Sequence, residues 1–147
     1  MNARGLFECY GVELEYMIVG HDDLSIRPFS DRVLKAVAGE YVSEIELGPL
    51  NWSNELVLHV IEIKTGSPPD DLAGLDKLFQ EAVAQINGIL AEWDACLMPT
   101  AMHPWMDPTR ETHLWPHEYS PVYDTLNRIF GCQGHGWANL QLSLIHI

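Results

Sequence analysis

The chain has 147 residues, of which 47% are hydrophobic, which is enough for one modest globular domain with an apolar core. Its 21 acidic and 8 basic residues give a net charge of −13, which disfavours binding to nucleic acids or anionic membranes and favours binding of cations. Three cysteines without a CxxC pair, no signal-peptide pattern and no apolar run of about 18 residues predict a cytoplasmic protein.

The first third of the chain predicts two strands and a short helix. Alternating apolar residues from Leu6 to Val19 predict a strand, and one of its faces carries Glu13 and Glu15. Ser30 is a candidate N-cap for a helix that runs to about Gly39. The stretch YVSEIEL then predicts a second strand, which GPLNWSN interrupts.

The middle of the chain predicts a buried strand followed by the longest helix. The segment from Glu55 to Thr65, ELVLHVIEIKT, is rich in β-branched residues and apolar on both faces, so we expect it near the centre of a sheet. Ser67 and Pro68 predict the start of a helix that continues to about Asp94. The apolar stripe of this helix indicates that one side packs on the sheet.

The last third predicts one more helix and two short strands. CLMPTAMHPWMDP begins as a strand and ends as a proline-rich loop. Ser120 as a cap and Gly131 as a stop bracket a helix. The residues of this helix that are predicted to face inward are Leu126, Ile129 and Phe130. GCQGHGWANLQ is interpreted as a glycine-rich turn that enters a strand.

The final residues 142–147, LSLIHI, differ from everything before them. They match one reading frame of the transposase adaptor used in making sequencing libraries, so we expect a tail that is foreign to the domain. An ordinary short apolar strand is the alternative. We therefore expect one domain over residues 1–141, followed by this tail.

Two of the predicted strands carry acidic side chains whose negative charge needs a compensating partner. Residues two apart in a strand point the same way, with Cα atoms about 6.5 to 7 Å apart, so Glu13 and Glu15 project together. A strand with one solvent-facing side would explain that pair alone. Glu62 lies in an apolar strand, where an ionised carboxylate is costly unless Lys64, another base or a cation neutralises it. Glu55 is an odd number of residues from Glu62, so in a regular strand their side chains would point to opposite faces. Glu55 joins the group only if the strand is bent.

Three or four carboxylates that converge on one face of a sheet predict an oxygen-rich site for a hard cation, above all Mg²⁺. Such a cation bridges and neutralises phosphate oxygens in ATP chemistry. The chain has no GxxxxGK[ST] motif, so a P-loop enzyme is not expected.

The histidines suggest a competing interpretation. His113 and His117 have the i, i+4 spacing of a zinc site, but a proline between them disfavours the helix that such a site needs. We interpret both as surface or loop residues. His59, on an apolar strand, is typical of a hydrogen-bonded core or site-wall residue. His103 and His135 lie in loops flanked by proline and glycine, which favours a place on the wall of a cleft.

Four stretches of the sequence occur together, and in this order, in a known family. They cover most of residues 7–141 and are GVELEYMIV, SNELVLHVIEIKTG, LMPTAMHPW and EYSPVYDTLNRIFGCQGHGWANLQ. The chain thereby resembles the carboxylate-amine ligase family related to glutamate-cysteine ligase of the second, bacterial and plant, type. The most specific stretch is RIFGCQGHGWANLQ.

The resemblance implies an α+β fold, in which a curved antiparallel sheet has helices packed on one face. Residues 1–141 would be the N-terminal part of one glutamine-synthetase-like catalytic domain. The resemblance also implies that Glu13, Glu15 and Glu62 are Mg²⁺ ligands. Glu55 matches a further acidic position, and ATP is the second cofactor.

The implied reaction joins a carboxylate to an amine. ATP phosphorylates the carboxylate, usually the side chain of glutamate, and an amine such as cysteine attacks the acyl phosphate to form an amide. The partners are small molecules, with neither nucleic acid nor membrane, and a homo-oligomer is left open. Arg128, His103 and His135 are candidates for the wall of the substrate pocket, and no catalytic base is identified.

The chain departs from the family pattern at its end. The family domain is longer, and a metal-binding histidine follows GWANLQ in it, where LSLIHI stands here. His146 has the wrong spacing for that histidine. We therefore expect the longer parent protein to be a ligase and this chain to have little activity by itself.

Two other classes of function remain. One is a non-catalytic metal- or partner-binding domain that dimerises through an open sheet edge. The other is a zinc hydrolase that uses the histidines and that would bind zinc without Glu13 and Glu15. We rank the hydrolase last.

Overall fold

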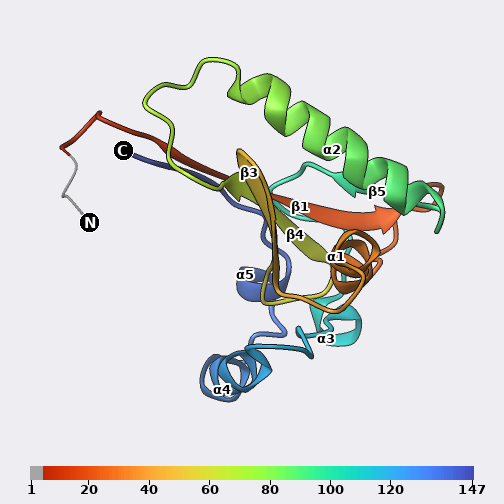
Figure 1. Cartoon of the computed structure of the whole chain (residues 1–147). Helices are drawn as coiled ribbons and strands as arrows, with labels where there is room; N and C mark the ends of the chain where they lie inside the picture. Colours follow the sequence, from red (N-terminus) through yellow and green to blue (C-terminus); the bar gives the residue numbers. More distant parts are fainter. Residues whose placement is uncertain (1–4) are drawn as a thin grey trace.

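The computed structural model describes residues 5–147 and shows an α+β fold, the class that the sequence predicted (Figure 1). The strands are β1 Gly11–Gly20, β2 Glu44–Leu47, β3 Leu50–Asn54, β4 Val60–Thr65, β5 Ala95–Met98 and β6 Ser143–His146. The helices are α1 Ser30–Ala38, α2 Leu75–Ala91, α3 Pro108–Glu111, α4 Ser120–Phe130 and α5 His135–Ala138. Within residues 5–147, no helix combines the length and the apolarity needed to span a bilayer.

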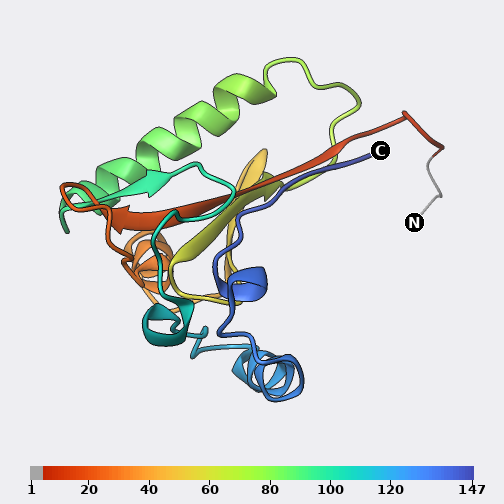
Figure 2. The ribbon, with the colours of Figure 1, turned by 180° about the vertical axis from the view of Figure 1, so that it is seen from behind.

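The six strands form one open antiparallel sheet in the order β2-β3-β4-β1-β5, with β6 also paired to β1. β1 is long enough to contact three strands. Its residues 13–17 pair with β4, residues 17–20 pair with β5, and residues 11–14 pair with β6. β5 and β6 therefore share one side of β1. The first half of β1 and β6 run side by side away from α3, α4 and α5 (Figure 2).

One face of the sheet packs against α1 and α2 and forms the main core. Strand alternation directs every second side chain to this face, and each fully buried large aliphatic or aromatic side chain contributes about 1.5 to 3 kcal/mol. The buried residues of this core include Ile18, Trp52, Ile61 and Ile63 from the sheet, Val33 and Leu34 from α1, and Phe79, Ile86 and Leu90 from α2. The predicted packing of helices on one face is confirmed.

The opposite face carries a smaller apolar cluster and the acids. The cluster consists of Met17, Val19, Ile26, Val57, Val60, Met106 and Ala138. Glu15 precedes Met17 by two residues, and Glu62 follows Val60 by two, so both carboxylates lie on this second face. The sheet thus separates its main core from its charged groups.

The stretch GPLNWSN was predicted to interrupt the second strand, and it does so only at its first two residues. Gly48 has a φ of 76° and, with Pro49, makes the two-residue link between β2 and β3. Glycine adopts such a positive φ without a steric penalty. β3 follows at once and pairs along β4, with Trp52 buried at 2% exposure. The turn signal is therefore confined to the first two residues.

Two predicted strands begin later than expected. β1 begins at Gly11 instead of Leu6, and β4 begins at Val60 instead of Glu55. Residues 55–59 form a turn in which the Leu58 N–H donates to the carbonyl of His113 at 2.9 Å. Because Glu55 lies outside the strand, the parity argument that separated it from Glu62 does not apply.

The predicted hydroxyl caps of the helices are also wrong. Ser30 and Ser120 are the first residues of α1 and α4, and neither helix has a side-chain cap hydrogen bond. α2 begins at Leu75, seven residues beyond the predicted first turn at Pro68, and follows a glycine. Gly131, with a φ of 67°, ends α4 as predicted.

The C-terminal region departs furthest from the prediction. α4 buries none of its residues, and the side chains expected to face inward include Ile129 and Phe130 at 61% and 57% exposure. Residues 135–138 form α5 where a turn and a strand were expected. Residues 143–146 of the tail form β6, which pairs with β1, and the foreign origin of this tail stays a prediction.

Candidate functional site

Glu15, Glu55 and Glu62 form a cluster of three carboxylates, which we call the acid cluster. One oxygen of each lies within 4.8 Å of the others. Glu15 comes from β1, Glu62 from β4, and Glu55 from the turn that joins β3 to β4. The structure therefore brings together three of the four acids that the sequence analysis proposed as metal ligands.

The sheet register explains why two of these acids meet. Glu15 lies opposite Glu62 in the β1–β4 pair. The Glu15 N–H donates to the Leu142 carbonyl at 3.0 Å, on the other side of β1, so Glu15 and Glu62 form a non-hydrogen-bonded pair. In such a pair the Cα atoms approach to about 4.5 Å and the side chains lie closer together than in a hydrogen-bonded pair.

Glu62 is the best-compensated member of the acid cluster. It is buried at 7% exposure, and its Oε2 accepts a hydrogen bond from the Ser53 hydroxyl at 2.6 Å. The Lys64 Nζ lies 2.9 Å from the same oxygen and 3.1 Å from Glu44 Oε2. Burial alone would lower the pKa of Lys64, but its hydrogen bonds to both glutamates raise that pKa above its ordinary value. Lys64 is thus the partner of Glu62 that the sequence suggested.

The surroundings of the other two acids disfavour their ionised form. Burial, together with repulsion from Glu15 and Glu62, raises the pKa of Glu55 from 4.5 to about 8. Burial is also the main cause that raises the pKa of Glu15; the Leu142 N–H opposes this shift, and the charges of Glu62 and Glu13 add to it. Three carboxylates share one nearby ammonium, so the cluster favours a proton or a cation.

Glu13, the fourth acid that was proposed as a ligand, lies outside the acid cluster. It projects from the same face of β1 as Glu15, but it lies opposite Lys64 in the strand register. Its Oε1 is 3.3 Å from the Nε2 of His146 in β6. The tail histidine therefore contacts Glu13, and the cluster consists of Glu15, Glu55 and Glu62.

Two hollows border the acid cluster. The first has a volume of about 360 Å³ and is mostly apolar; its lining includes Glu15, Glu55, Val57, Tyr123, Leu126, Trp137 and Leu142. The second has a volume of about 400 Å³ and is mostly polar; its lining includes Ser43, Glu44, Ser53, Asn54, Lys64 and Glu118. Ser53 and Lys64, which contact Glu62, belong to the second hollow. The cluster thus borders an apolar and a polar recess.

The three residues proposed for the substrate pocket line neither hollow. His103 is buried, and its Nε2 lies 2.7 Å from the Leu24 carbonyl. Its backbone N–H donates to Asn139 Oδ1 at 2.7 Å, so His103 fastens the loop after β5 to the end of α5. His135 and Arg128 are both exposed. The structure thus places all three positions outside these two hollows, and their contact with a substrate stays a prediction.

Two further histidines, His117 and His59, have structural partners. The Nε2 of His117 lies 2.9 Å from Asp31 Oδ2, and its ring stacks on Tyr41. His59 is fully buried, its Nε2 lies 2.7 Å from the Ala138 carbonyl, and burial lowers its pKa to about 4. These contacts confirm the expectation that His59 is a hydrogen-bonded core residue.

Sequence reasoning missed the groups that surround the acids. Ser53 was assigned to a break, although it follows Trp52 in an alternating stretch that could have indicated a strand. Tyr123 lines the apolar hollow, and its hydroxyl accepts a hydrogen bond from Asn54 Nδ2 at 2.9 Å. Trp137 comes from α5, far along the chain. No local pattern predicts contacts at such sequence separations.

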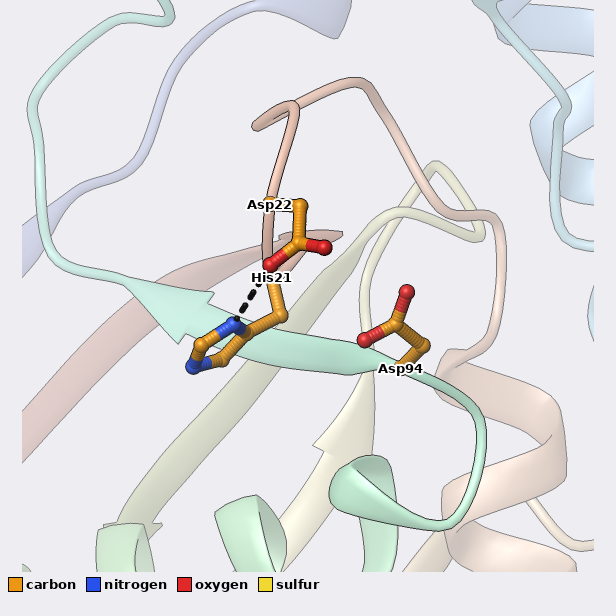
Figure 3. A group of neighbouring side chains, drawn as sticks. All are labelled: His21, Asp22 and Asp94. Carbon is orange, nitrogen blue, oxygen red and sulfur yellow. Dashed lines mark hydrogen bonds and ion pairs between the residues drawn. The ribbon is translucent and has the colours of Figure 1, made fainter.

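A second group of residues whose side chains can bind metal ions lies at the opposite end of β1. Figure 3 shows His21 and Asp22, which follow β1, and Asp94, which precedes β5. The His21 Nδ1 is 3.2 Å from Asp22 Oδ1. The backbone N–H of His21 donates to the backbone carbonyl of Asp94 at 3.0 Å. All three residues are exposed, so water can solvate their charges and no cation is required.

Comparison with known proteins adds one relative. No family model matches the chain. An uncharacterized protein of Archaeoglobus fulgidus is 30% identical over 137 residues, which are 93% of this chain and 36% of the relative. The chain therefore spans about a third of the length of the relative that it matches. The name of that relative assigns no activity to it.

Proposed function

We propose that this chain is part of an ATP- and Mg²⁺-dependent carboxylate-amine ligase, in which Glu15, Glu55 and Glu62 hold the metal. The observation that carries the proposal is the meeting of these three carboxylates within 4.8 Å, beside a single lysine. The four sequence stretches that resemble the glutamate-cysteine ligase family supply the reaction class. The three free cysteines agree with a cytoplasmic location.

The chemistry of the acid cluster fits a hard divalent cation. Its donors are carboxylate oxygens, which Mg²⁺ prefers over nitrogen and sulfur. Lys64 pairs with Glu62, whereas burial and repulsion between the acids raise the pKa values of Glu15 and Glu55, so a bound cation would favour their ionised form. When bound, Mg²⁺ would neutralise phosphate oxygens during phosphoryl transfer.

The surrounding residues would prepare the site. Ser53 and Lys64 both contact Oε2 of Glu62, so they fix this carboxylate and leave its second oxygen available to a ligand. Tyr123 and Trp137 border the apolar hollow beside Glu15. Such side chains would limit the access of water, which would otherwise hydrolyse an activated carboxylate.

In the proposed reaction, ATP phosphorylates a carboxylate, such as the side chain of glutamate. ADP leaves, an amine such as that of cysteine attacks the acyl carbon, and the carbon–oxygen bond to phosphate breaks. The amine proton passes to the released phosphate, so an amide and inorganic phosphate result. The substrates are therefore small molecules. Because the chain spans 36% of its relative, we assign the complete reaction to a longer protein and expect this chain alone to have little turnover.

Calorimetric titration with a non-hydrolysable ATP analogue, with and without Mg²⁺, tests the proposal. We expect nucleotide binding only with Mg²⁺ and at least about tenfold weaker binding in Glu15→Gln and Glu62→Gln, since each loses one charged metal contact. Glu81→Gln, an exposed position on α2, makes the same charge change away from the site and should leave binding unchanged. Glu13→Gln tests whether the fourth acid also contributes.

The titrations also separate the alternatives. Binding of Mg²⁺ without any nucleotide would favour a non-catalytic metal-binding domain. Tight zinc binding that survives both glutamine variants would favour the hydrolase, and binding of neither metal nor nucleotide would contradict the ligase. ATP- and Mg²⁺-dependent amide formation by the purified chain would overturn the expectation that it is inactive alone.

A further inference from the structure

The polar hollow beside the acid cluster is a candidate binding site in its own right. Its volume is about 400 Å³, and its lining comes only from residues 42–44, 53–54, 64 and 118–119, so it does not depend on the tail at residues 142–147. Ser53 belongs to this lining, and its Oγ lies 2.6 Å from Oε2 of Glu62. A ligand in the hollow would therefore lie one side chain away from the acid cluster.

The two serines of the hollow present lone pairs instead of protons. A serine hydroxyl has one proton to donate, and an ionised carboxylate can only accept. Ser43 donates its proton to Glu118 Oε2 at 3.2 Å, and Ser53 donates to Glu62 Oε2 at 2.6 Å. Both serines are buried, at 6% and 4% exposure, so each hydroxyl oxygen has only acceptor capacity left for a ligand.

Asn54 adds an acceptor that has no partner. Its Nδ2 donates to the Glu55 carbonyl at 3.0 Å, and because a carbonyl only accepts, this bond fixes the orientation of the amide. The residue is 8% exposed, and within residues 5–147 its Oδ1 takes part in no hydrogen bond. Because that oxygen is not sealed from solvent, it is open to a ligand in the hollow that Asn54 lines.

The charge of the hollow is negative. The ammonium of Lys64 has three protons, and Glu62 Oε2 at 2.9 Å and Glu44 Oε2 at 3.1 Å engage two of them. Glu118 is exposed, and within residues 5–147 its carboxylate has only the Ser43 hydroxyl as a partner. The lining thus opposes the carboxylates of Glu44 and Glu118 to one ammonium, which Glu62 also shares.

We propose that the polar hollow binds the ammonium group of a small primary amine that carries no carboxylate. An ammonium donates three hydrogen bonds and accepts none, so it complements Asn54 Oδ1, the serine oxygens and the Glu118 carboxylate. Hydrogen bonds from a charged donor are roughly twice as strong as neutral ones. A carboxylate on the ligand would meet Glu44 and Glu118 and would find only the last proton of Lys64, so an amino acid is disfavoured.

The size of the hollow favours an organic ammonium over a metal ion. A single water needs only about 10 to 15 Å³, so about 400 Å³ has room for an ammonium together with its carbon chain. Val42 and Tyr119 supply apolar contacts for that chain. Identification of this ligand as the amine substrate rests on the proposed ligase, and it narrows that amine from amino acids such as cysteine to amines without a carboxylate. Binding in the hollow does not depend on the ligase.

Titration of the ¹⁵N-labelled full chain with ethanolamine hydrochloride, followed by NMR, tests the proposal. Glycine is the matched probe, because it has the same ammonium but ends in a carboxylate where ethanolamine ends in a hydroxyl. At constant ionic strength, without Mg²⁺ or nucleotide, we expect saturable amide shifts at Ser43, Asn54 and Glu118, with a dissociation constant on the order of 10⁻³ M. Glycine should bind at least about tenfold more weakly, and ethanol, which lacks the ammonium, should not bind.

Glu118→Gln removes the least compensated carboxylate of the hollow and should weaken ethanolamine binding about tenfold. Because Glu118 is exposed, this variant should fold. Glu118→Asp keeps the charge and should bind ethanolamine more tightly than Glu118→Gln. Glu92→Gln, at an exposed acid that follows α2, makes the same charge change elsewhere and should leave the dissociation constant unchanged.

Equal binding of ethanolamine and glycine, shifts spread evenly over the exposed acids, the lack of a saturable shift, or unchanged binding in Glu118→Gln would each overturn the proposal. Its failure can be told apart from that of the ligase. Ethanolamine binding in the hollow without Mg²⁺-dependent nucleotide binding would support this site and contradict the ligase. Nucleotide binding without ethanolamine binding would support the ligase and overturn this site.

Discussion

Glu15 and Glu62 face each other across a non-hydrogen-bonded position of the β1–β4 pair, with their carboxylates on the same face of the sheet. Like charges directly opposite each other destabilise a sheet. Lys64 and Ser53 contact Glu62, whereas Glu15 accepts the Leu142 N–H. The negative charge of Glu62 therefore has a positively charged partner, whereas that of Glu15 has only a backbone N–H.

The first prediction concerns the pH dependence of stability that Glu55 causes. The pKa of Glu55 is about 8 in the folded chain, compared with 4.5 for the free side chain. Between these values the folded state keeps a proton that the unfolded state releases, so the free energy of unfolding falls as pH rises. The slope is at most about 1.4 kcal/mol per pH unit. Urea unfolding at several pH values measures it.

Glu55→Gln provides the control for this prediction. Glutamine cannot ionise, so the variant should lose most of the slope and should be more stable than the parent at about pH 9. Saturating Mg²⁺ should reduce the slope in the parent and have less effect in the variant. Identical pH profiles for the two proteins would contradict the assignment of a strongly raised pKa to Glu55.

The second prediction concerns the opposite pH dependence of His59. Burial lowers the pKa of His59 from 6.5 to about 4. The unfolded chain therefore takes up a proton that the folded chain excludes, and stability should be lost as pH falls from 6.5 toward 4. His59→Gln, which keeps an N–H donor near the Ala138 carbonyl, should flatten this part of the profile. If the stability of the parent and of His59→Gln fell equally with pH below 6.5, His59 would not be the cause of the loss.

The third prediction concerns Lys64 as the counter-charge of the acid cluster. Lys64→Met leaves Glu62 buried without its ammonium, and we expect a loss of about 3 kcal/mol in the free energy of unfolding. Lys64→Arg keeps the charge and should recover most of that loss. Mg²⁺ should raise the melting temperature of Lys64→Met more than that of the parent, because the metal replaces the missing charge. An equal rise in melting temperature with Mg²⁺ in both proteins would argue against a cation in the acid cluster.

The fourth prediction concerns Asn139, which joins α5 to the loop after β5. Asn139 is 1% exposed; its Oδ1 accepts the His103 N–H at 2.7 Å, and its Nδ2 donates to the His103 carbonyl at 3.0 Å. Asn139→Ala leaves two buried backbone groups unpaired and should cost about 2 to 3 kcal/mol. Gln133→Ala, exposed in the same region, should change stability by less than about 0.5 kcal/mol in the same urea measurement.

The acids of β1 and β4 could be predicted because strand alternation alone decides which face a side chain occupies. Glu15 and Glu62 needed only the correct register to meet. Alternation does not decide how far along the face each carboxylate lies, so it could not distinguish Glu13 from Glu15. Glu55 was correctly linked to a bend, but the bend is a complete turn that precedes the strand. Its position depends on contacts with residues far along the chain.

The contacts of the loop histidines could not be predicted for a related reason. A histidine between prolines and glycines can line a cleft or can fasten two segments together, and the local sequence is the same in both cases. His103 fastens two segments, because its partners Leu24 and Asn139 lie far away in the sequence. The exposed face of α4 was misjudged because periodicity identifies an apolar side without identifying what covers it.

Leu142 connects the sheet edge to the candidate metal ligands through two reciprocal bonds. Its N–H donates to Glu15 Oε2 at 2.8 Å, and its carbonyl accepts the Glu15 N–H at 3.0 Å. Peeling the last strand off β1 would therefore also release the carboxylate of Glu15. Whatever anchors or displaces the C-terminal strand should shift the affinity of this chain for a cation, and occupancy by a cation should in turn alter how firmly that strand is held.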